Sequence, residues 1–464
     1  MNGDSERTTT SKADAMRDGT RRMHRREFLK AVGFGAAGTV VGGGLVGGAL
    51  DSRVFAPAAS AATTKIGLAA TDGYITMPGR ETNPIYIFGF IPVDPNATVA
   101  ALTSKYKGHA QHTAPILGFD QEDYIKVTLT NLGLVQRPDL TDSHTIHWHG
   151  FDVPSPLNDG VPEVSVAVPI GKQLTYFYYP HREGTYMWHC HFEDVEHVQM
   201  GMTSIVFVRP LQDGKLRKFD GKTFTKFAYN DGDGSTGYDR HFAILLNETW
   251  AEQHDGDRDI QETIPTDFNP EWFTLNGRAY PQTALLNDDP DIPVAWLPTS
   301  GTTSGLTTTN PNYGTDDKSQ PNSSLIQVNP GDRVLLRLAN LGYTQDSMEL
   351  PGLPMHVIGQ DASLLRNGAG TIADPYVDTT YWTNTLYFGP GEARDVLFDA
   401  PAYDAASPSD SDSVGAYNVY LFKNRDWRKL SNDGAPGRGG MMTEVRVYQG
   451  SPLPDQTVVS QTYA

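Results

Sequence analysis

The sequence predicts an all-β protein built from two tandem Greek-key β-sandwich domains. The 46 glycines and 31 prolines supply turns, while the 21 tyrosines and 19 phenylalanines are residue types that strands favour. Apolar and polar residues alternate in short runs, most clearly at residues 123–131, with the period of a half-buried strand. Because the second half of the chain repeats this pattern, we expect two sandwiches rather than one.

The chain of 464 residues is long enough for two or three domains. We expect the first sandwich at residues 62–211 and the second at residues 223–450, with a polar linker at 212–222. The second domain carries a long polar loop at 297–324, and another at 403–414. A loop as long as the first is usually functional or disordered.

Residues 1–61 have the pattern of a twin-arginine signal peptide. Arg25 and Arg26 are followed by Phe28, a weakly apolar glycine-rich run, and small residues that suit a signal peptidase at 59–61. We therefore expect cleavage near residue 62 and a secreted or extracytoplasmic protein. An uncleaved anchor is the alternative, although the apolar run is short for a membrane span.

Charge and cysteine content narrow the classes of partner. The whole chain has 37 Lys and Arg against 55 Asp and Glu; removing residues 1–61 takes away nine and six of these, which leaves 28 minus 49, or −21. This balance disfavours nucleic acid and anionic membranes and attracts cationic partners or metal ions. A surface whose negative charge only keeps the protein soluble explains this balance equally well. The single cysteine excludes a framework of intrachain disulfides.

The internal repeat pairs specific segments of the two halves. Residues 125–133 match 334–342, residues 144–150 match 353–359, and residues 184–191 match 415–422. Within these segments Leu421 stands where the first half has its cysteine. Only one histidine of the first half, His147, keeps a histidine counterpart, which is His356. The second domain therefore lacks most of the metal-binding side chains of the first.

Histidines and the cysteine of the first half form a metal-binding pattern. Cys190 stands between two histidines, and seven of the thirteen histidines fall between His144 and His197. A thiolate, imidazoles and the thioether of Met202 are the ligands of a blue-copper site. The alternative is that the cysteine is buried as a small hydrophobic residue and binds no metal. On a strand, His189 and His191 face one side and Cys190 the other, and the same alternation puts His147 and His149 on one side.

These motifs resemble those of the multicopper oxidase family, which includes laccases, and residues 159–162, 273–278 and 440–445 are also similar to family sequence. The resemblance implies cupredoxin-like domains, copper as the cofactor, and oxidation of an external donor with dioxygen as acceptor. It assigns Asp159 to proton relay, although a turn-capping aspartate is an equal alternative. The implied copper ligands are His144, Cys190, His197 and Met202 for type 1, His147 for type 2, and His149, His189 and His191 for type 3.

Three features depart from the family pattern. Six residues separate Cys190 from His197, more than in typical laccases, and the type 1 motif lies in the first domain rather than the last. A full three-copper cluster needs eight histidines, whereas the first domain offers four and the second only His356. Two-domain relatives, which resemble nitrite reductases, imply a homotrimer in which a neighbouring chain supplies His356. The alternative is a histidine of the domain core.

The remaining polar residues of interest have weaker patterns. We expect His109, His112 and His181 at the surface, with a copper-delivery role for the first two as the alternative. Residues 189–202, here named the copper loop, contain acidic residues such as Glu193 and Glu196 that put negative charge near the point of electron entry. A solvated loop explains them equally.

The sequence is thus interpreted as a laccase-like oxidoreductase. A copper nitrite-reductase-like enzyme, with nitrite as acceptor, is one alternative, and a non-catalytic blue-copper electron-transfer or copper-binding protein is another. Copper content per chain separates them. Phenols, metal ions and a redox protein all remain candidates for the electron donor. Only 11 methionines are present, without a methionine-rich insertion, which disfavours specialised oxidation of cuprous ion.

Overall fold

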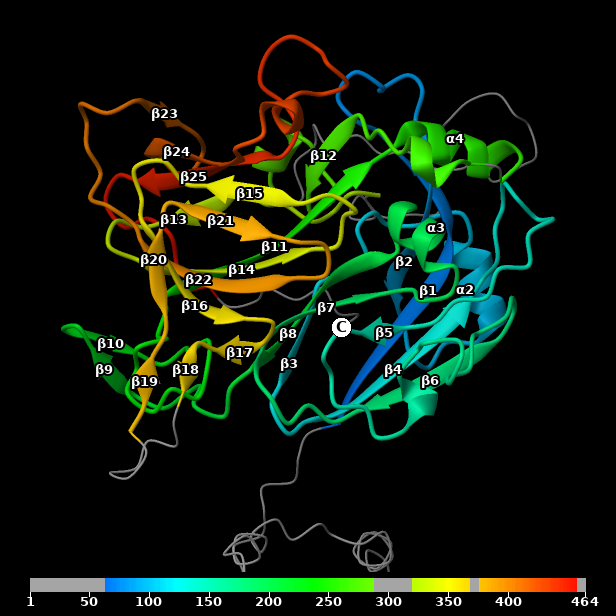
Figure 1. Ribbon diagram of the computed structural model, residues 1–464, viewed down its shortest axis with the longest axis horizontal. Helices are drawn as coiled ribbons and strands as arrows, with labels where there is room; N and C mark the ends of the chain where they lie inside the picture. Colours follow the sequence, from blue (N-terminus) through cyan, green and yellow to red (C-terminus); the bar gives the residue numbers. More distant parts are fainter. Residues whose placement is uncertain (1–62, 262, 288–318, 368–374, 457–464) are drawn as a thin grey trace, which may run out of the picture. The chain divides into compact units, whose positions relative to one another are not determined.

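The computed structural model describes residues 63–261, 263–287, 319–367 and 375–456 (Figure 1). The expected signal peptide and most of the loop at 297–324 lie outside these ranges, so both expectations stay predictions. Among the described residues, no helix has the length and apolar character needed to cross a membrane.

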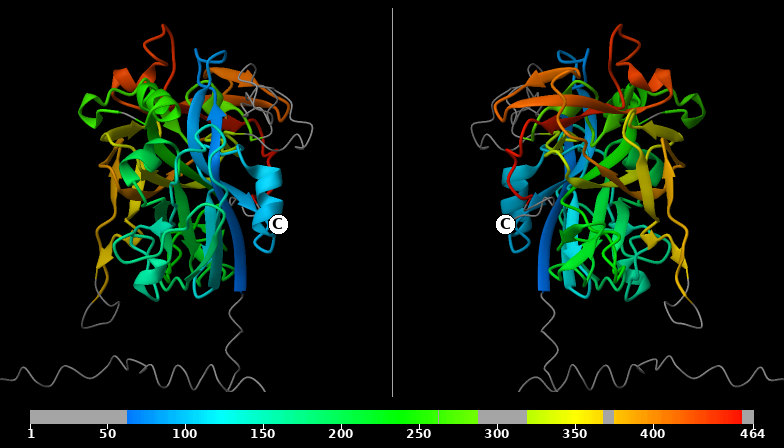
Figure 2. Two further views of the ribbon diagram at one scale, coloured as in Figure 1. Left: turned by 90° about the vertical axis from the view of Figure 1, so that its right-hand side faces the viewer. Right: turned by 90° about the vertical axis from the view of Figure 1, so that its left-hand side faces the viewer.

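The first half forms two four-stranded sheets, with strand orders β2-β1-β4-β6 and β3-β8-β7-β5. The side views in Figure 2 show the blue and cyan strands β1 and β4 as one layer beside the green strands of the other sheet. The strands are β1 (Thr63–Ile75), β2 (Ile85–Val93), β3 (Leu117–Asp120), β4 (Tyr124–Asn131), β5 (His147–Trp148), β6 (Gln173–Tyr178), β7 (Gly184–His189) and β8 (Thr203–Arg209). Its helices are α2 (Val99–Tyr106), α3 (Asp194–Gln199) and the 3-10 turn η1 (Pro156–Asn158).

The second half forms a seven-stranded and a six-stranded sheet. The first has the order β12-β11-β14-β22-β16-β17 with β20 on β16, and the second has the order β13-β25-β24-β15-β21 with β23 on β24. The larger sheet contains β11 (Arg240–Thr249), β12 (Trp272–Leu275), β14 (Arg333–Asn340), β16 (Met355–Gln360), β17 (Ser363–Leu364), β20 (Tyr381–Thr383) and β22 (Ala393–Asp399). The smaller contains β13 (Ile326–Val328), β15 (Asp346–Glu349), β21 (Thr385–Phe388), β23 (Ser409–Ser411), β24 (Ala416–Asn424) and β25 (Met442–Tyr448).

Besides these two sheets, the described residues that follow the first half form four short helical elements and two short hairpins. The helical elements are α4 (Ala251–Asp259), η2 (Pro265–Asp267), η3 (Gln282–Ala284) and η4 (Trp427–Leu430). One hairpin pairs β9 (Arg217–Phe219) with β10 (Lys222–Phe224), and the other pairs β18 (Arg366–Asn367) with β19 (Val377–Asp378). The segment 212–222, expected as a plain linker, therefore contains a strand, and β23 lies within the expected loop at 403–414.

Strand pairing repeats between the halves. β1 runs parallel to β4 and β3 parallel to β8, just as β11 runs parallel to β14 and β13 parallel to β25. The expected all-β fold of two similar sandwiches is confirmed. Both halves lie in one compact unit, so the domain boundaries at 211 and 223 stay predictions.

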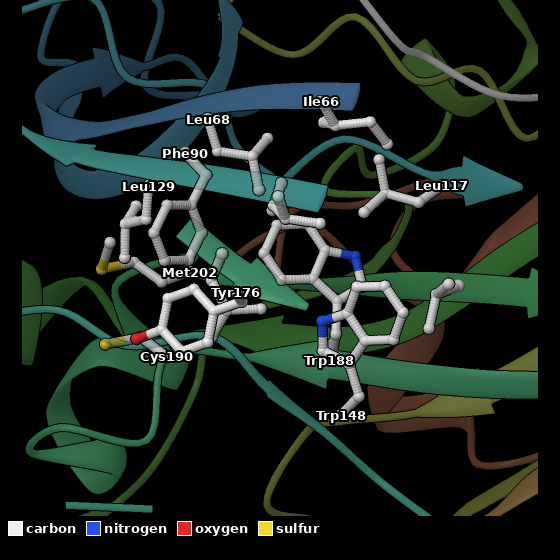
Figure 3. Packing of buried hydrophobic residues seen from close by; sticks show 14 of the residues in the cluster. Ile66, Leu68, Phe90, Leu117, Leu129, Trp148, Tyr176, Trp188, Cys190 and Met202 are labelled. Atoms are coloured by element: carbon white, nitrogen blue, oxygen red, sulfur yellow. The ribbon is translucent and has the colours of Figure 1, made fainter. Parts of the chain in front are cut away.

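The first core surrounds the cysteine. On β4 the side chains of Ile125, Val127 and Leu129 are buried, as their alternation predicts. They pack in one cluster with Trp188, Cys190 and Met202. Figure 3 shows aromatic rings of this cluster, among them Phe90, Tyr176 and Trp188, together with the sulfur-containing side chains of Cys190 and Met202. Burial of this many apolar side chains holds the cysteine in a rigid, dry setting.

Strand β7 is buried on both faces because the second half covers its outer side. Met187 joins residues of β8, β11 and β22 in a shared apolar cluster. Thr185 donates a hydrogen bond of 2.5 Å to Asp395, and Arg337 donates to the Thr185 hydroxyl at 3.1 Å. The strand that leads to the metal-binding motif is thus fixed from both sides.

Candidate metal centres

The first metal-binding group consists of His144, Cys190 and His197. Their ligand atoms all lie within 4.8 Å of one another, and all three side chains are buried. The Cys190 sulfur lies 3.7 Å from Nδ1 of His144 and 3.2 Å from Nδ1 of His197. Both imidazoles therefore turn Nδ1 toward the thiol, so that two nitrogens and one sulfur converge where a single ion could bind.

Backbone contacts place the members of this group. The N–H of Cys190 donates to the carbonyl of Met202 at 3.0 Å, and that methionine is fully buried in the same core. His144 forms an isolated bridge with Val168. His197 lies on α3, and the residue just before this helix, Glu193, has a left-handed φ of 48° that turns the chain sharply after the cysteine motif. The six-residue spacing that departs from the family pattern is thus taken up by one short helix.

Thr145 ties the two histidine motifs together. Its backbone N–H donates to the Cys190 sulfur at 3.4 Å, and its hydroxyl accepts from the backbone N–H of His191 at 3.0 Å. Such bonds to a cysteine sulfur tune a blue-copper site. Sequence reasoning missed this residue, although its place inside the first histidine motif was a usable signal.

The second group consists of His147, His149 and His189, with His191 beside them. The ligand atoms of the first three lie within 4.8 Å of one another. Pairing of β5 with β7 sets His147 opposite His189. Nε2 of His149 and Nε2 of His189 are 2.9 Å apart, and the ring of His191 lies 4.9 Å from that of His147. Four imidazoles thus meet at one edge of the sheet.

Hydrogen bonds fix which nitrogen of two of these rings is free. Nδ1 of His147 donates to the carbonyl of Asp159 at 2.7 Å, and Nδ1 of His189 donates to the carbonyl of Cys190 at 2.7 Å. A carbonyl only accepts, so each Nδ1 carries the proton and each Nε2 is left as a metal ligand. A carboxylate oxygen of Asp159 also lies 3.5 Å from Nδ1 of His147.

Burial keeps four of the imidazoles of the two groups neutral, which is the form that binds metal. It lowers the pKa of His144 and of His189 to about 3 and that of His149 to about 4. Burial also lowers the pKa of His197 well below its usual value. The thiol of Cys190 is held neutral as well, because burial raises its pKa to about 12. A cation at the first group would reverse this preference and favour the thiolate.

The structure keeps His356 apart from both groups within one chain. Its Nε2 lies 2.8 Å from the Thr380 hydroxyl, and its half-buried ring stacks on Trp382 at a centroid distance of 4.6 Å. The role assigned to it therefore stays a prediction.

The expectation for two other histidines was wrong. His109 and His112 are 2% and 1% exposed, whereas His181 is exposed as expected. His112 is buried because the copper loop at Gly201 and the second half at Gly277 both close over it. Sequence alone gave no sign of this cover, which comes from two distant segments.

Acidic residues surround the outer side of His197. Oxygen atoms of Asp142 and Glu193 form a third potential ligand group with that imidazole. Burial raises the pKa of Asp142 to about 6, and burial together with Asp257 raises the pKa of Glu196 to about 8. The position of Asp257 on α4, in the other half of the chain, could not be seen in the sequence.

Comparisons with known proteins agree with this geometry. A family model described as multicopper oxidase matches residues 106–213, which contain both histidine motifs. A putative laccase-9 from Oryza sativa subsp. japonica is 22% identical over 313 residues; the match covers 66% of this chain and 41% of that protein. The chain thus spans less than half the length of that curated relative.

Two solved structures have the same fold. A blue copper oxidase from Nitrosomonas europaea superposes with a TM-score of 0.53 at 20% identity, covering 83% of this chain and 86% of its own. A multicopper oxidase named mgLAC gives a TM-score of 0.53 at 20% identity, with 86% and 90% covered. Copper is the cofactor of this family, and the two groups offer the sulfur and nitrogen ligands that suit it. Residues 106–213 thus match the multicopper oxidase family model, and the chain carries them on a fold of two cupredoxin-like sandwiches.

Proposed function

We propose that this protein is a laccase-like copper oxidase. It oxidises an external donor, one electron at a time, at the group of His144, Cys190 and His197, and electrons pass to the four-histidine group, where dioxygen is reduced. The observation that supports this most directly is the position of Cys190 between His189 and His191. His189, the last residue of β7, and the adjacent Cys190 therefore belong to two different metal-binding groups.

This arrangement gives a short covalent route between the groups. The side chain of Cys190 points to His144 and His197, whereas its carbonyl accepts the N–H of His189 at 2.7 Å. Copper bound at the two groups supplies the one-electron redox chemistry. The protein contributes neutral imidazoles, a dry thiol, and a strand clamped by the second half.

Dioxygen is favoured over nitrite as acceptor because four imidazoles converge at the second group. A single copper for nitrite needs fewer histidines from this domain. Reduction of dioxygen also consumes protons, and we assign their relay to Asp159, whose carboxylate lies beside His147.

We further propose a homotrimer in which His356 of a neighbouring chain completes the second group. Exposed apolar side chains flank each of the two surfaces that would meet. In the first half these are Leu157, Val164, Val166 and Phe177, which lie in or contact the loop whose Asp159 binds His147. In the second half they are Tyr381 and Trp382 of β20, which pairs with the His356 strand, and the preceding Tyr376 and Val377. Two different apolar surfaces on one chain suit a head-to-tail ring rather than a twofold dimer. Export by the twin-arginine route to an extracytoplasmic location completes the proposal.

Dioxygen uptake by the copper-loaded protein tests the oxidase activity. With a phenol as donor we expect uptake that is lost in Cys190→Ser, together with the absorption near about 600 nm that the copper–thiolate bond gives. Far-UV circular dichroism should show that the variant remains folded. A wild-type protein that binds copper but shows no such band would contradict the assignment of the first group, and a blue protein without uptake would leave an electron carrier.

A further inference from the structure

A short connecting segment of the first half, residues 112–114, contacts the end of the copper loop at two points. The ring of His112 lies against Gly201 so closely that a Cβ built on that glycine would lie 2.3 Å from Cδ2 of the ring. Two residues further on, the N–H of Ala114 donates to the carbonyl of Thr203 at 3.1 Å. The single residue between these two contact points is the proposed axial copper ligand. We name residues 112–114 the clamp segment.

Met202 is the residue between the two contact points, and its backbone is tied to the first metal group. Its N–H donates to the carbonyl of His197 at 3.0 Å, and its carbonyl accepts the N–H of Cys190 at 3.0 Å. Its side chain is fully buried in the first core. A contact that displaces Gly201 also displaces the chain that carries this thioether, because close-packed interiors transmit strain.

The second half of the chain holds the clamp segment from another direction. The N–H of His112 donates to the carbonyl of Ser319 at 2.7 Å, and Asn322 donates to the carbonyl of Ala114 at 3.4 Å. A Cβ built on Gly277 would lie 2.6 Å from Nδ1 of the His112 ring. This nitrogen and Cδ2 are on opposite edges of an imidazole. The ring therefore lies between one glycine of each half, and neither glycine has room for a side chain.

The fit of the His112 ring, rather than its polarity, explains its position. The side chain is 1% exposed, and neither ring nitrogen has a hydrogen-bond partner among the described residues. The ring fills the space between the two glycines. A planar ring sets the distance between two backbones more firmly than a flexible side chain does, because rotation about two bonds is its only freedom.

We propose that His112 is a positioning residue for the first metal group: its ring transmits the position of the second half to Gly201 and so fixes the thioether of Met202. This inference deepens the proposed function and rests on it, since it takes Met202 as the axial ligand of a type 1 copper. The axial ligand tunes the redox potential of such a copper. The second half, although it has lost most copper ligands, thereby sets the driving force with which electrons leave the first group.

His112→Ala removes the ring and tests its role in copper-loaded protein without turnover. A thioether that is held less firmly stabilises Cu²⁺ less, so the reduction potential of the type 1 copper should rise. We also expect the relative intensities of the thiolate-to-copper absorption bands to change and the copper lines in electron paramagnetic resonance to broaden. His112→Phe keeps a planar ring without ring nitrogens and should stay closer to the wild type. His109→Ala is the matched control, because it removes a similarly buried imidazole, 2% exposed, from the same connection.

Gly277→Ala tests the contribution of the second half. Its added Cβ would meet Nδ1 of His112 and displace the ring. We expect the copper spectrum and the reduction potential to change, although this residue lies in the half that lacks most ligands. Gly232→Ala is the matched control, because both glycines have a φ of +77° and no atom lies within 4 Å of a Cβ added at Gly232. Far-UV circular dichroism should show that all variants are folded.

The outcomes separate this inference from the proposed function. An unchanged spectrum and potential in His112→Ala and Gly277→Ala would overturn the positioning role, and so would equal shifts in His112→Ala and His109→Ala. Equal shifts in His112→Phe and His112→Ala would overturn it as well, since a ring nitrogen would then matter rather than the fit. If His112→Ala does not fold, the comparison of Gly277→Ala with Gly232→Ala decides. A blue wild-type protein that takes up no dioxygen would overturn the proposed oxidase, while the spectral comparison would still decide the role of His112.

Discussion

At the scale of single residues, Thr145 bears on both metal groups. Replacing it with valine keeps its shape but removes the hydroxyl that accepts from the N–H of His191. That N–H would then be partly buried without an acceptor, so we expect the free energy of unfolding of the metal-free protein to fall by about 1–2 kcal/mol. Urea unfolding measures this difference. Thr128→Val is the control, because its hydroxyl meets that of Thr175 on a half-exposed face; an equal loss in both variants would contradict the role given to Thr145.

Asp257 makes stability depend on pH in a defined direction. Burial raises its pKa to about 7 from a usual value of 3.8. The protonated carboxyl fits the folded state, so its favourable contribution is complete below about pH 4 and is lost as the pH rises through about 7. Asp257→Asn has no such loss. In metal-free protein we therefore expect the free energy of unfolding of Asp257→Asn to rise relative to that of the wild type between pH 5 and pH 8, as measured by urea unfolding. A difference that is constant or shrinks over this range would show that the carboxyl is not held in a buried site.

At the scale of elements, Gly160 controls the position of Asp159. Its φ is +80°, and a Cβ built there would lie 2.1 Å from the carbonyl oxygen of Ile146. Gly160→Ala must therefore shift the loop that carries the acceptor of the His147 ring, and we expect loss of copper from the second group while the blue band remains. Gly171→Ala is a matched control, since its φ is +74° with no atom within 4 Å of the added Cβ. Copper counting and absorption on both variants measure the outcome; equal copper content in the two would contradict it.

The elements also show how far sequence reasoning reaches. Period-two alternation predicted β4, and the two histidine motifs predicted which side chains gather, because strand geometry relates neighbours along one chain. Strand β7 does not alternate, since the second half buries its outer face. His112 and Asp257 were misjudged or missed for the same physical reason. Their burial depends on segments far away in sequence, and no local pattern records such contacts.

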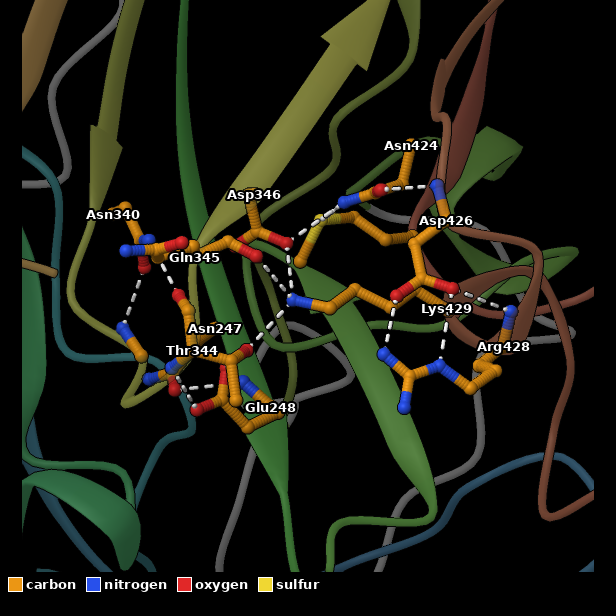
Figure 4. A network of polar contacts seen from close by, with 12 residues as sticks. Asn247, Glu248, Asn340, Thr344, Gln345, Asp346, Asn424, Asp426, Arg428 and Lys429 are labelled. Carbon is orange, nitrogen blue, oxygen red and sulfur yellow. Dashed lines mark hydrogen bonds and ion pairs between the residues drawn. The ribbon is translucent and has the colours of Figure 1, made fainter. Parts of the chain in front are cut away.

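At the scale of the whole molecule, the two halves are joined by polar as well as apolar contacts. In the second half, buried Lys429 binds Asp346 at 2.7 Å beside Glu248, and Figure 4 shows how this network links β15 with η4 and β11. Glu248 also connects to the copper loop, because its carbonyl accepts from Gln199 of α3 at 2.7 Å. The cupredoxin-like second half therefore supports the metal-binding half although it has lost most of the ligands.

The arrangement of whole chains decides whether His356 has a role in the second group. Within one chain it contacts Thr380 and Trp382 rather than another histidine. If a neighbouring chain brings it to His147, His356→Ala should lower copper occupancy of the second group and dioxygen uptake about tenfold or more, while the blue colour and its reduction by a donor remain. His181→Ala, which removes an exposed histidine of the first half, is the control and should keep both. Copper counting, absorption and uptake on the same samples, with the mass of the assembly from light scattering, measure the effect. A fully active His356→Ala, or an active monomer, would contradict the shared site and leave His356 as a residue that packs β16 against β20.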